Sequence, residues 1–380
     1  MRELYTEDLS IAGRRAEIEE KLIRVRALLE NEKKEAFLFL KHPNFSWITA
    51  GAKGFVANCF DDSAIAILVT KTGAYAICNV IEEPRVKEEE HLEELGFEFM
   101  VYAWQKNGIH DAVKKQVGNV NTVLCDTPFA EACVATDLLR PLRIQFTKNE
   151  IGRWLHLGDV MSKALEEYLA TVTPGMTEYE IAGGISKALW KHNIEQVMHL
   201  VSVDERVDKY RHALPTDKKL RNNLLVAING RYKGLVTTVS RMVYCGKPSE
   251  EFSSQYRDCC DMEMETMFKA QVGADELEMY DTLRQAYDKR GYSDMFDKHG
   301  QGGCQGYWPR EYMITPDAHY TVRENMAYCY NPVVDGTKAE DAFLVLPEGL
   351  THITRPISFP KINYDFNGKT YERPDILVID

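Results

Sequence analysis

Two histidines lie in segments whose composition suits chemistry on a bound ligand. His212 belongs to residues 210–215, which we expect to lie where a strand enters a loop, and its imidazole could accept and release a proton near neutral pH. His299 opens residues 299–306, a run with four glycines in eight residues, and glycine lets the backbone approach a ligand closely. Both are candidate catalytic residues, although a loop histidine and a glycine-rich hairpin corner are also ordinary structural features.

Aromatic and cationic side chains follow the glycine-rich run. Arg310 could hold a substrate carboxylate through two parallel hydrogen bonds, and Tyr307 or Trp308 could form a wall of the pocket. The structural alternative for Arg310 is a surface ion pair with Glu311, which would contribute little to stability. We therefore predict that Arg310, Tyr307 and Trp308 bind substrate.

Glu340 is the third candidate catalytic residue. The pair Glu340 and Asp341 could be a solvated acidic turn, as most such pairs are. If Glu340 is buried, its carboxylate must either pair with a cation or take up a proton. A partner such as His212, His299 or Arg310 would satisfy that need.

The first half of the chain carries alternating helix and strand patterns. Apolar residues recur at helical spacing in its first helix, and turn residues separate the strands that follow. We expect a helix at 13–32, strands at 36–40, 64–69 and 74–78, a helix at 85–95 and a strand at 97–102. This alternation predicts a small α/β domain with a mostly parallel or mixed sheet. Phe45 and Trp47, between these elements, are more typical of a core than of a site.

The second half begins near residues 141–147, which gives predicted domains at 1–146 and 147–380. A long periodic helix is predicted over 151–168, and the next helix starts where Thr177 can cap it and Glu180 can complete a capping box. Strands with turns dominate 197–246, and another helix is predicted at 249–271. The fold class is therefore α+β.

Composition narrows the possible partners. The 380 residues are 44% hydrophobic and 27% charged, which is typical of a globular protein with two ordinary cores, and the net charge of −12 disfavours nucleic acid and anionic lipid. The charged N-terminus and the lack of an apolar run of membrane-spanning length predict a cytoplasmic protein that does not enter a membrane. Nine cysteines, an odd number, argue against a fully paired disulfide framework. A small molecule or short peptide is the expected substrate.

Several segments together resemble the creatinase, prolidase and aminopeptidase P family. The matching segments occur in the family's order, at residues 173–180, 211–217, 234–241, 299–303, 331–332 and 340–341. The segment at 44–51 and the hairpin that follows resemble the family's smaller domain more faintly. The resemblance implies a pita-bread fold for residues 147–380, preceded by a smaller creatinase-like α/β domain. It also implies a homodimer in which the partner chain approaches the active site.

The family's peptidases bind two divalent metals through two aspartates, one histidine and two glutamates. Two such cations that share a bridging water need several anionic oxygens. In this chain the corresponding positions are Ala227 or Asn229, Thr238, Gly303, Asn331 and Glu340. One carboxylate cannot hold a dinuclear site, so we predict no metal and no other cofactor.

Creatinase, as a family member, hydrolyses a C–N bond without metal and uses a histidine that matches His212. The glutamates that creatinase also uses are replaced here by Ser240 and Asn331, and Asn331 becomes a predicted substrate-binding residue. The family register places His299 and Glu340 in the pocket and Arg310 near the site of a substrate-contacting histidine. It gives Arg241 a supporting role beneath the site.

Three functions fit these residues. The first is a metal-independent hydrolase that cleaves an amide or amidino C–N bond of a small carboxylate-bearing substrate, with His212 transferring the proton. The second is a catalytically silent pita-bread protein that binds a metabolite or peptide. The third is a Xaa-Pro aminopeptidase or dipeptidase whose metal ligands lie outside the family's motifs. The first and second require the same pocket, so the sequence does not separate them.

Overall fold

The computed structural model describes residues 2–317 and 319–380. The chain divides into two compact units, of which the smaller comprises residues 7–149 and 233–235 and the larger comprises most of the remainder, from residue 150 onward, with the N-terminal residues up to Thr6. The predicted boundary stood between residues 146 and 147. Within the described residues, no helix combines the length and apolar character needed to cross a membrane. All nine cysteines are unpaired thiols.

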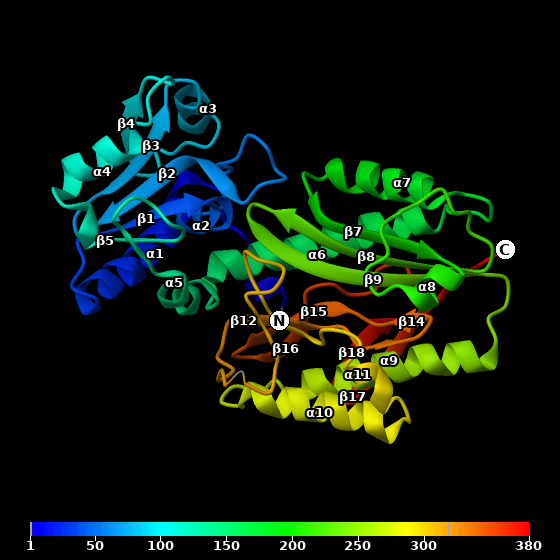
Figure 1. The fold of residues 1–380 in the computed structure, drawn as a ribbon. Coiled ribbons are helices and arrows are strands. Elements are labelled where there is room, and N and C mark those ends of the chain that lie inside the picture. The colour runs from blue at the N-terminus through cyan, green and yellow to red at the C-terminus, as the bar shows by residue number, and fades with distance from the viewer. Residues whose placement is uncertain (1, 318) are drawn as a thin grey trace. The chain divides into compact units, whose positions relative to one another are not determined.

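The smaller unit contains a mixed sheet with the strand order β4-β3-β2-β1-β5-β6 (Figure 1). Its elements are α1 Ile11–Asn31, β1 Ala36–Lys41, α2 His42–Ile48, β2 Asp62–Thr70, β3 Ala74–Asn79, α3 Glu83–Glu88, β4 Glu98–Tyr102, α4 Ile109–Val117, β5 Val123–Cys125, β6 Cys133–Val134 and α5 Thr136–Arg143. β1 pairs antiparallel with β2 and parallel with β5, as a mixed sheet requires. Phe45 and Trp47 are buried in this unit's core, as predicted.

The predicted helix at 85–95 is shorter in the structure. Helix α3 ends at Glu88, and His91 has a φ of 60°, in the left-handed region that a continuing right-handed helix excludes. Leu92 and Leu95 still face the core, but turns and not a helix carry them there.

The larger unit is built on a nine-stranded sheet with the path β11-β10-β12-β15-β9-β8-β7, to which β16 and β19 add at β15 and β9. The strands of the unit are β7 Glu195–Val203, β8 Asn223–Tyr232, β9 Leu235–Cys245, β10 Gly302–Gln305, β11 Tyr312–Met313, β12 Met326–Tyr330, β13 Val333–Val334, β14 Thr337–Lys338, β15 Asp341–Leu346, β16 Gly349–His352, β17 Lys361–Phe366, β18 Lys369–Pro374 and β19 Leu377–Ile379. Within the described residues, β10 pairs antiparallel with β11 and β12, β15 with β12, β16 and β9, and β7 with β8, whereas β19 pairs parallel with β9.

Helices cover this sheet in two groups. They are α6 Lys148–Leu169, α7 Glu178–Trp190, α8 Glu205–Lys209, α9 Glu250–Lys269, α10 Glu276–Lys289 and α11 Ser293–Phe296, with a short 3-10 helix η1 at Arg2–Leu4. In Figure 1, α6 and α7 accompany β7–β9, whereas α9 and α10 lie below β12–β14. This α+β arrangement is the pita-bread architecture expected from the sequence.

Local sequence explains where one of these helices begins and how closely another packs. The side chain of Thr177 accepts from Glu180 N, and the side chain of Glu180 accepts from Thr177 N, so the predicted capping box is confirmed. On α6, Gly158 faces the segment after β16 so closely that a Cβ there would lie 2.0 Å from the carbonyl oxygen of Ile353. A glycine is therefore required at this contact.

We expect the substitution Gly158→Ala to destabilise the larger unit. The new methyl group would displace backbone atoms of Ile353, and overpacking of this kind costs about 1–3 kcal/mol. The control Gly183→Ala, at an exposed position of α7 with nothing within 4 Å of its Cβ, should instead stabilise by about 0.5–1 kcal/mol through helix propensity. Urea unfolding followed by circular dichroism measures both changes. Equal effects of the two substitutions would contradict the packing described for α6.

Candidate active site

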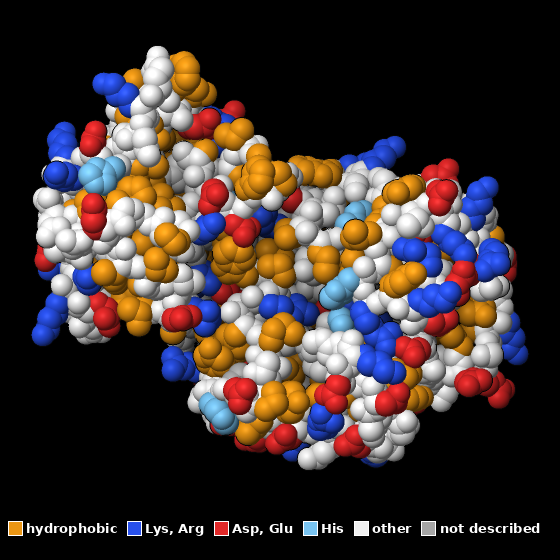
Figure 2. Space-filling view, in the orientation of Figure 1, with side chains coloured by type: hydrophobic (Ala, Val, Ile, Leu, Met, Phe, Trp, Pro, Cys, Tyr) orange, Lys and Arg blue, Asp and Glu red, His pale blue; other side chains and the backbone are white. Residues whose placement is uncertain are grey.

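The candidate site lies where β9, β12, β14 and the start of β15 meet. Val239 of β9 pairs with Asp341 of β15, which brings the neighbouring side chains of Ser240 and Glu340 together. Tyr330, the last residue of β12, pairs with both Gly302 and Asp341. The antiparallel register therefore collects residues from distant parts of the sequence at one place. On the surface of the larger unit, histidine and basic side chains lie next to one another (Figure 2).

Glu340 is held between two cations. Its Oε2 lies 2.7 Å from Lys338 Nζ and accepts from Ser240 Oγ over 2.8 Å, and its Oε1 accepts from Arg310 Nη2 over 3.0 Å. The residue is only 2% exposed. Burial by itself raises the pKa of Glu340, but the charges of Lys338 and Arg310 and the hydrogen bonds outweigh burial and hold the pKa at about 2. The carboxylate is therefore ionised at neutral pH and already neutralised by neighbouring side chains.

Lys338 was missed by the sequence analysis. It stands two residues before Glu340, and its side chain is 4% exposed. Residues two apart in an extended chain point to the same side, so the Lys-x-Glu spacing was a usable signal. It had low specificity, because lysine near glutamate is common on protein surfaces.

Arg310 is already engaged on both terminal nitrogens. Nη2 donates to Glu340, and Nη1 donates to the carbonyl of Pro309 over 2.8 Å and to Thr238 Oγ1 over 3.4 Å. The alternative, a surface ion pair with Glu311, does not describe these contacts, because Arg310 pairs with Glu340 and Glu311 is itself buried. A substrate carboxylate at Arg310 would have to compete with Glu340.

Neutral residues occupy the other positions where the resemblance implied metal ligands. Thr238 Oγ1 donates to Asn229 Oδ1 over 2.8 Å and accepts from Gln305 Nε2 over 2.5 Å. Gln305, at the end of β10, was also missed by the sequence analysis. Among the described residues, neither Gln305 Oε1 nor Asn331 Oδ1 has a hydrogen-bond partner, although both side chains are buried. Buried acceptors of this kind are normally satisfied, so they are candidates for contact with a ligand or water.

The two candidate histidines lie together. The ring centroids of His212 and His299 are 5.3 Å apart with an interplanar angle of 66°. Burial, and then the positive charge of Lys338, lower the pKa of His299 to about 3, so its ring is neutral at pH 7. Asn331 Nδ2 lies 2.9 Å from His299 Nε2, which fits a ring whose proton is on Nδ1. His212 is exposed in a turn that follows α8 and not at the end of a strand, which corrects the predicted position.

The two aromatic candidates have different surroundings. Tyr307 is buried, and its hydroxyl donates to Glu150 Oε1 over 2.7 Å and lies 3.4 Å from Arg153 Nη1 on α6. This contact anchors the loop before Arg310 to α6, and a role of Tyr307 in a pocket wall stays a prediction. Trp308 is partly exposed and its carbonyl accepts from Gly306 N, so its role at a pocket wall stays a prediction.

Arg241 supports the site from beneath. Its guanidinium is fully buried, with Nε 2.8 Å from Glu166 Oε1 and Nη1 3.0 Å from Asp341 Oδ1. Arg373 also contacts Asp341, so this carboxylate next to Glu340 binds two arginines. Breaking one member of such a buried pair leaves an uncompensated charge and is strongly destabilising. The structural role expected for Arg241 fits these contacts.

The residues present do not fit a pair of divalent metal ions. Within the described part of the chain, no cluster of three or more His, Cys, Asp or Glu side chains could hold a metal. At the positions that match the family's metal ligands, the chain has amide side chains, a hydroxyl and a glycine. The one carboxylate among them, that of Glu340, binds Lys338 and Arg310. One ammonium group and one guanidinium group surround Glu340. A divalent metal ion at this place would instead require anionic oxygens around it.

The depressed pKa of Glu340 predicts a specific acid sensitivity. Because the folded value of about 2 lies below the ordinary value of 4.5, ionised Glu340 contributes stability above pH 4.5 that is lost as the pH falls toward 2. The difference corresponds to about 3 kcal/mol. We expect Glu340→Gln to remove this contribution, so the free-energy gap between wild type and variant, measured by urea unfolding, should narrow from pH 5 to pH 3. The exposed control Glu167→Gln should show no such narrowing, and parallel pH profiles for wild type and Glu340→Gln would contradict the ion-pair arrangement.

Comparisons with known proteins agree with this architecture. The chain is 23% identical over 230 residues to a Xaa-Pro dipeptidase of Pyrococcus furiosus, and the match covers 58% of this chain and 65% of that protein. A dipeptidase structure from Pyrococcus horikoshii OT3 superposes with a TM-score of 0.76 at 19% identity, covering 94% of this chain and all of that one. The N-terminal domain of the FACT complex subunit SPT16 from chickpea superposes with a TM-score of 0.67 at 12% identity, covering 90% of this chain and 97% of that one.

A family model gives the assignment. The model of metallopeptidase family M24 matches residues 155–349, which are half of the chain and include each of the candidate site residues. The solved structures are too distant in sequence to show more than the fold, whereas the family match extends along β7–β15 and the loops that carry the site. The chain therefore belongs to metallopeptidase family M24.

Proposed function

We propose that the protein hydrolyses an amide or amidino C–N bond of a small molecule or short peptide without using a metal ion. The observation that carries this proposal is the buried Lys338, Glu340 and Arg310 group beside the His212 and His299 pair. The group has two positive charges and one negative charge, so a net positive charge remains in a poorly hydrated place. Such a place favours a ligand that carries, or develops, negative charge.

Proton transfer is assigned to His212. Its ring is exposed, and the neutral ring of His299 lies beside it. As water attacks the carbon of the scissile bond, a C–O bond forms and one proton of the water passes to His212. The C–N bond then breaks, and His212 returns the proton to the leaving nitrogen, so the step needs no other reactant. Asn331 fixes the orientation of His299 through Nε2.

Stabilisation of negative charge is assigned to Lys338 and Arg310. Lys338 has three N–H donors, and Glu340 accounts for one of its contacts. An oxygen that gains charge as water adds would be stabilised by an ammonium that is already held in place by Glu340. Glu340 itself acts as a positioning residue, because its pKa of about 2 makes it a poor general base.

A catalytically silent binding protein is the second candidate. It is favoured by the same pairing of Glu340, because no carboxylate at the centre of the site is left to activate water. The unpaired acceptors Gln305 Oε1 and Asn331 Oδ1 would serve such a protein as ligand contacts. The Xaa-Pro dipeptidase activity named for the Pyrococcus furiosus relative is disfavoured for this chain by the ligand positions. The predicted homodimer and the predicted lack of a cofactor stay predictions.

The first expected outcome concerns metal. Protein purified without chelator should contain less than about one equivalent of manganese, cobalt, iron or zinc by elemental analysis, because one paired carboxylate cannot balance two divalent charges. Added manganese should leave the melting temperature unchanged, since a ligand stabilises a protein only by binding its folded state. Two bound equivalents of metal, or a rise in melting temperature with manganese, would contradict the proposal that the protein works without a metal ion.

The second expected outcome concerns activity. In the presence of chelator we expect turnover of at least one compound from a panel of Xaa-Pro dipeptides and small amidino or amide carboxylates. His212→Ala should then lower kcat/KM by about 10²–10⁴-fold, as loss of a proton-transfer group does. The control His192→Ala changes an exposed histidine just after α7 and should keep full activity. Ligand binding without turnover would favour the binding protein, and activity abolished by chelator would contradict the proposal.

A further inference from the structure

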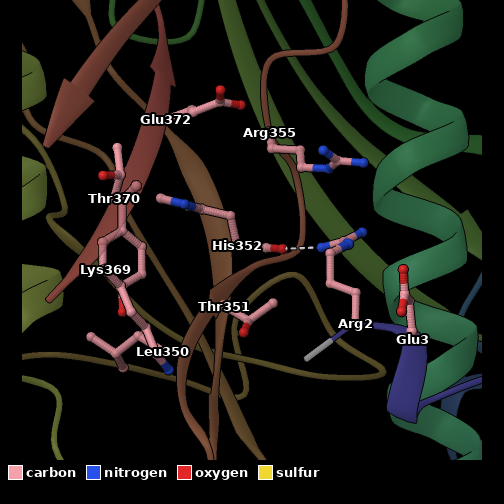
Figure 3. A pocket seen from close by; sticks show the side chains of 10 residues that line it. Arg2, Glu3, Leu350, Thr351, His352, Arg355, Lys369, Thr370 and Glu372 are labelled. Carbon is pink, nitrogen blue, oxygen red and sulfur yellow. Dashed lines mark hydrogen bonds between the residues drawn. The ribbon is translucent and has the colours of Figure 1, made fainter. Parts of the chain in front are cut away.

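A pocket lies in the larger unit, apart from the residues of the candidate site. Its volume is about 640 Å³, which is within the range of small-molecule sites. The lining comes from η1, from β16 and the residues after it, and from β18, and the residues are Arg2, Glu3, Leu350, Thr351, His352, Arg355, Lys369, Thr370, Tyr371 and Glu372. Figure 3 shows Arg2 and Arg355 on the same side of this pocket and His352 between Arg2 and Thr370.

Positive charge in this pocket is incompletely balanced. Arg2 Nη2 and Arg355 Nε both contact the same oxygen of Asp159, over 2.7 Å and 2.9 Å. Burial lowers the pKa of Arg2, Asp159 opposes that change, and the nearby charge of Arg355 lowers it further. Two guanidinium groups therefore share one carboxylate at short range. A bound anion would relieve their repulsion.

The other charged side chains of the pocket do not restore the balance. Lys369 Nζ donates to the backbone carbonyl of Glu348, which is a neutral partner. Glu372 forms an ion pair with Lys361, 2.8 Å apart, and Glu3 is exposed on η1. Among the described residues, Asp159 is thus the one carboxylate that forms an ion pair with any of the three cations Arg2, Arg355 and Lys369 of the lining, although the whole chain has a net charge of −12.

His352 presents a neutral polar side chain to the pocket. The residue is 7% exposed and lines the cavity, and among the described residues no hydrogen bond to its ring is present. Burial, and then the charge of Arg373, lower the pKa of His352 to about 3, so at neutral pH its ring is uncharged and carries one N–H donor and one acceptor. Tyr371, edge-on at 6.1 Å, packs against this ring on one side.

We propose that this pocket binds a small anion with at least two negative charges, the chemistry shared by phosphate compounds and by di- and tricarboxylates. Arg355 and Lys369 supply charge at its mouth, Arg2 supplies charge deeper in, and the ring of His352 supplies a neutral hydrogen bond. This site is separate from the proposed hydrolytic function, and its occupation does not depend on whether a C–N bond is cleaved.

Titration calorimetry with pyrophosphate and with citrate, each on the full-length protein at low salt, tests the proposal. We expect at least one of them to bind at one equivalent with a Kd below about 1 mM. Arg355→Gln and Lys369→Gln should each weaken binding by about tenfold, as expected for loss of a charged contact. Preference for pyrophosphate would identify a phosphate site, and preference for citrate a carboxylate site.

The control is Lys187→Gln, which removes the same charge from an exposed position of α7, outside the pocket lining. It should leave the affinity within about twofold, because exposed charges beyond contact distance are screened. The proposal fails if neither anion binds, if Lys187→Gln weakens binding as much as the pocket variants do, or if acetate binds as tightly as the multivalent probes. Arg355→Gln and Lys369→Gln alter partly or fully exposed side chains, and circular dichroism would verify that both variants fold.

Discussion

Burial of the Glu340 carboxylate between Lys338 and Arg310 is the interaction on which the rest of the site depends. A single carboxylate in a water-poor position must be neutralised, and two cations at 2.7 Å and 3.0 Å do so without a metal. The same contacts tie β14, the loop that carries Arg310 and the start of β15 to Ser240 on β9. Removing one partner would leave an unpaired charge at the centre of the sheet. The stability of each of these three side chains in its place therefore depends on the other two.

This constraint also determines which chemistry the site can support. In metal-dependent members of the family, anionic ligands surround cations, whereas here fixed cations surround one anion and neutral amides and hydroxyls take the other positions. The result is a site with a net positive charge, two adjacent imidazoles and two unpaired buried acceptors among the described residues. Such a site suits stabilisation of negative charge and proton transfer, and it gives no set of ligands for a metal-bound water.

Much of the architecture could be predicted from the sequence, because it rests on strong local patterns. The capping box of Thr177 and Glu180 and the long apolar periodicity of α6 are local features, and each forms as expected. The site was harder to predict, because it depends on strand register. Lys338 and Gln305 belong to residue types that are common outside sites, and their roles emerge only when β10, β12 and β14 are brought together. The contact of Tyr307 with Glu150 was also not predicted, because an aromatic ring in a site loop can anchor that loop to a helix as well as line a pocket.

The measurement that tests this account most directly is anomalous diffraction from crystals soaked in manganese at neutral pH. If the cations of Lys338 and Arg310 neutralise Glu340, no anomalous peak should lie within coordination distance of its carboxylate, and both contacts should persist. A pair of peaks about 3.5–4 Å apart at Glu340, with Lys338 displaced, would be the signature of a dinuclear site and would contradict the account.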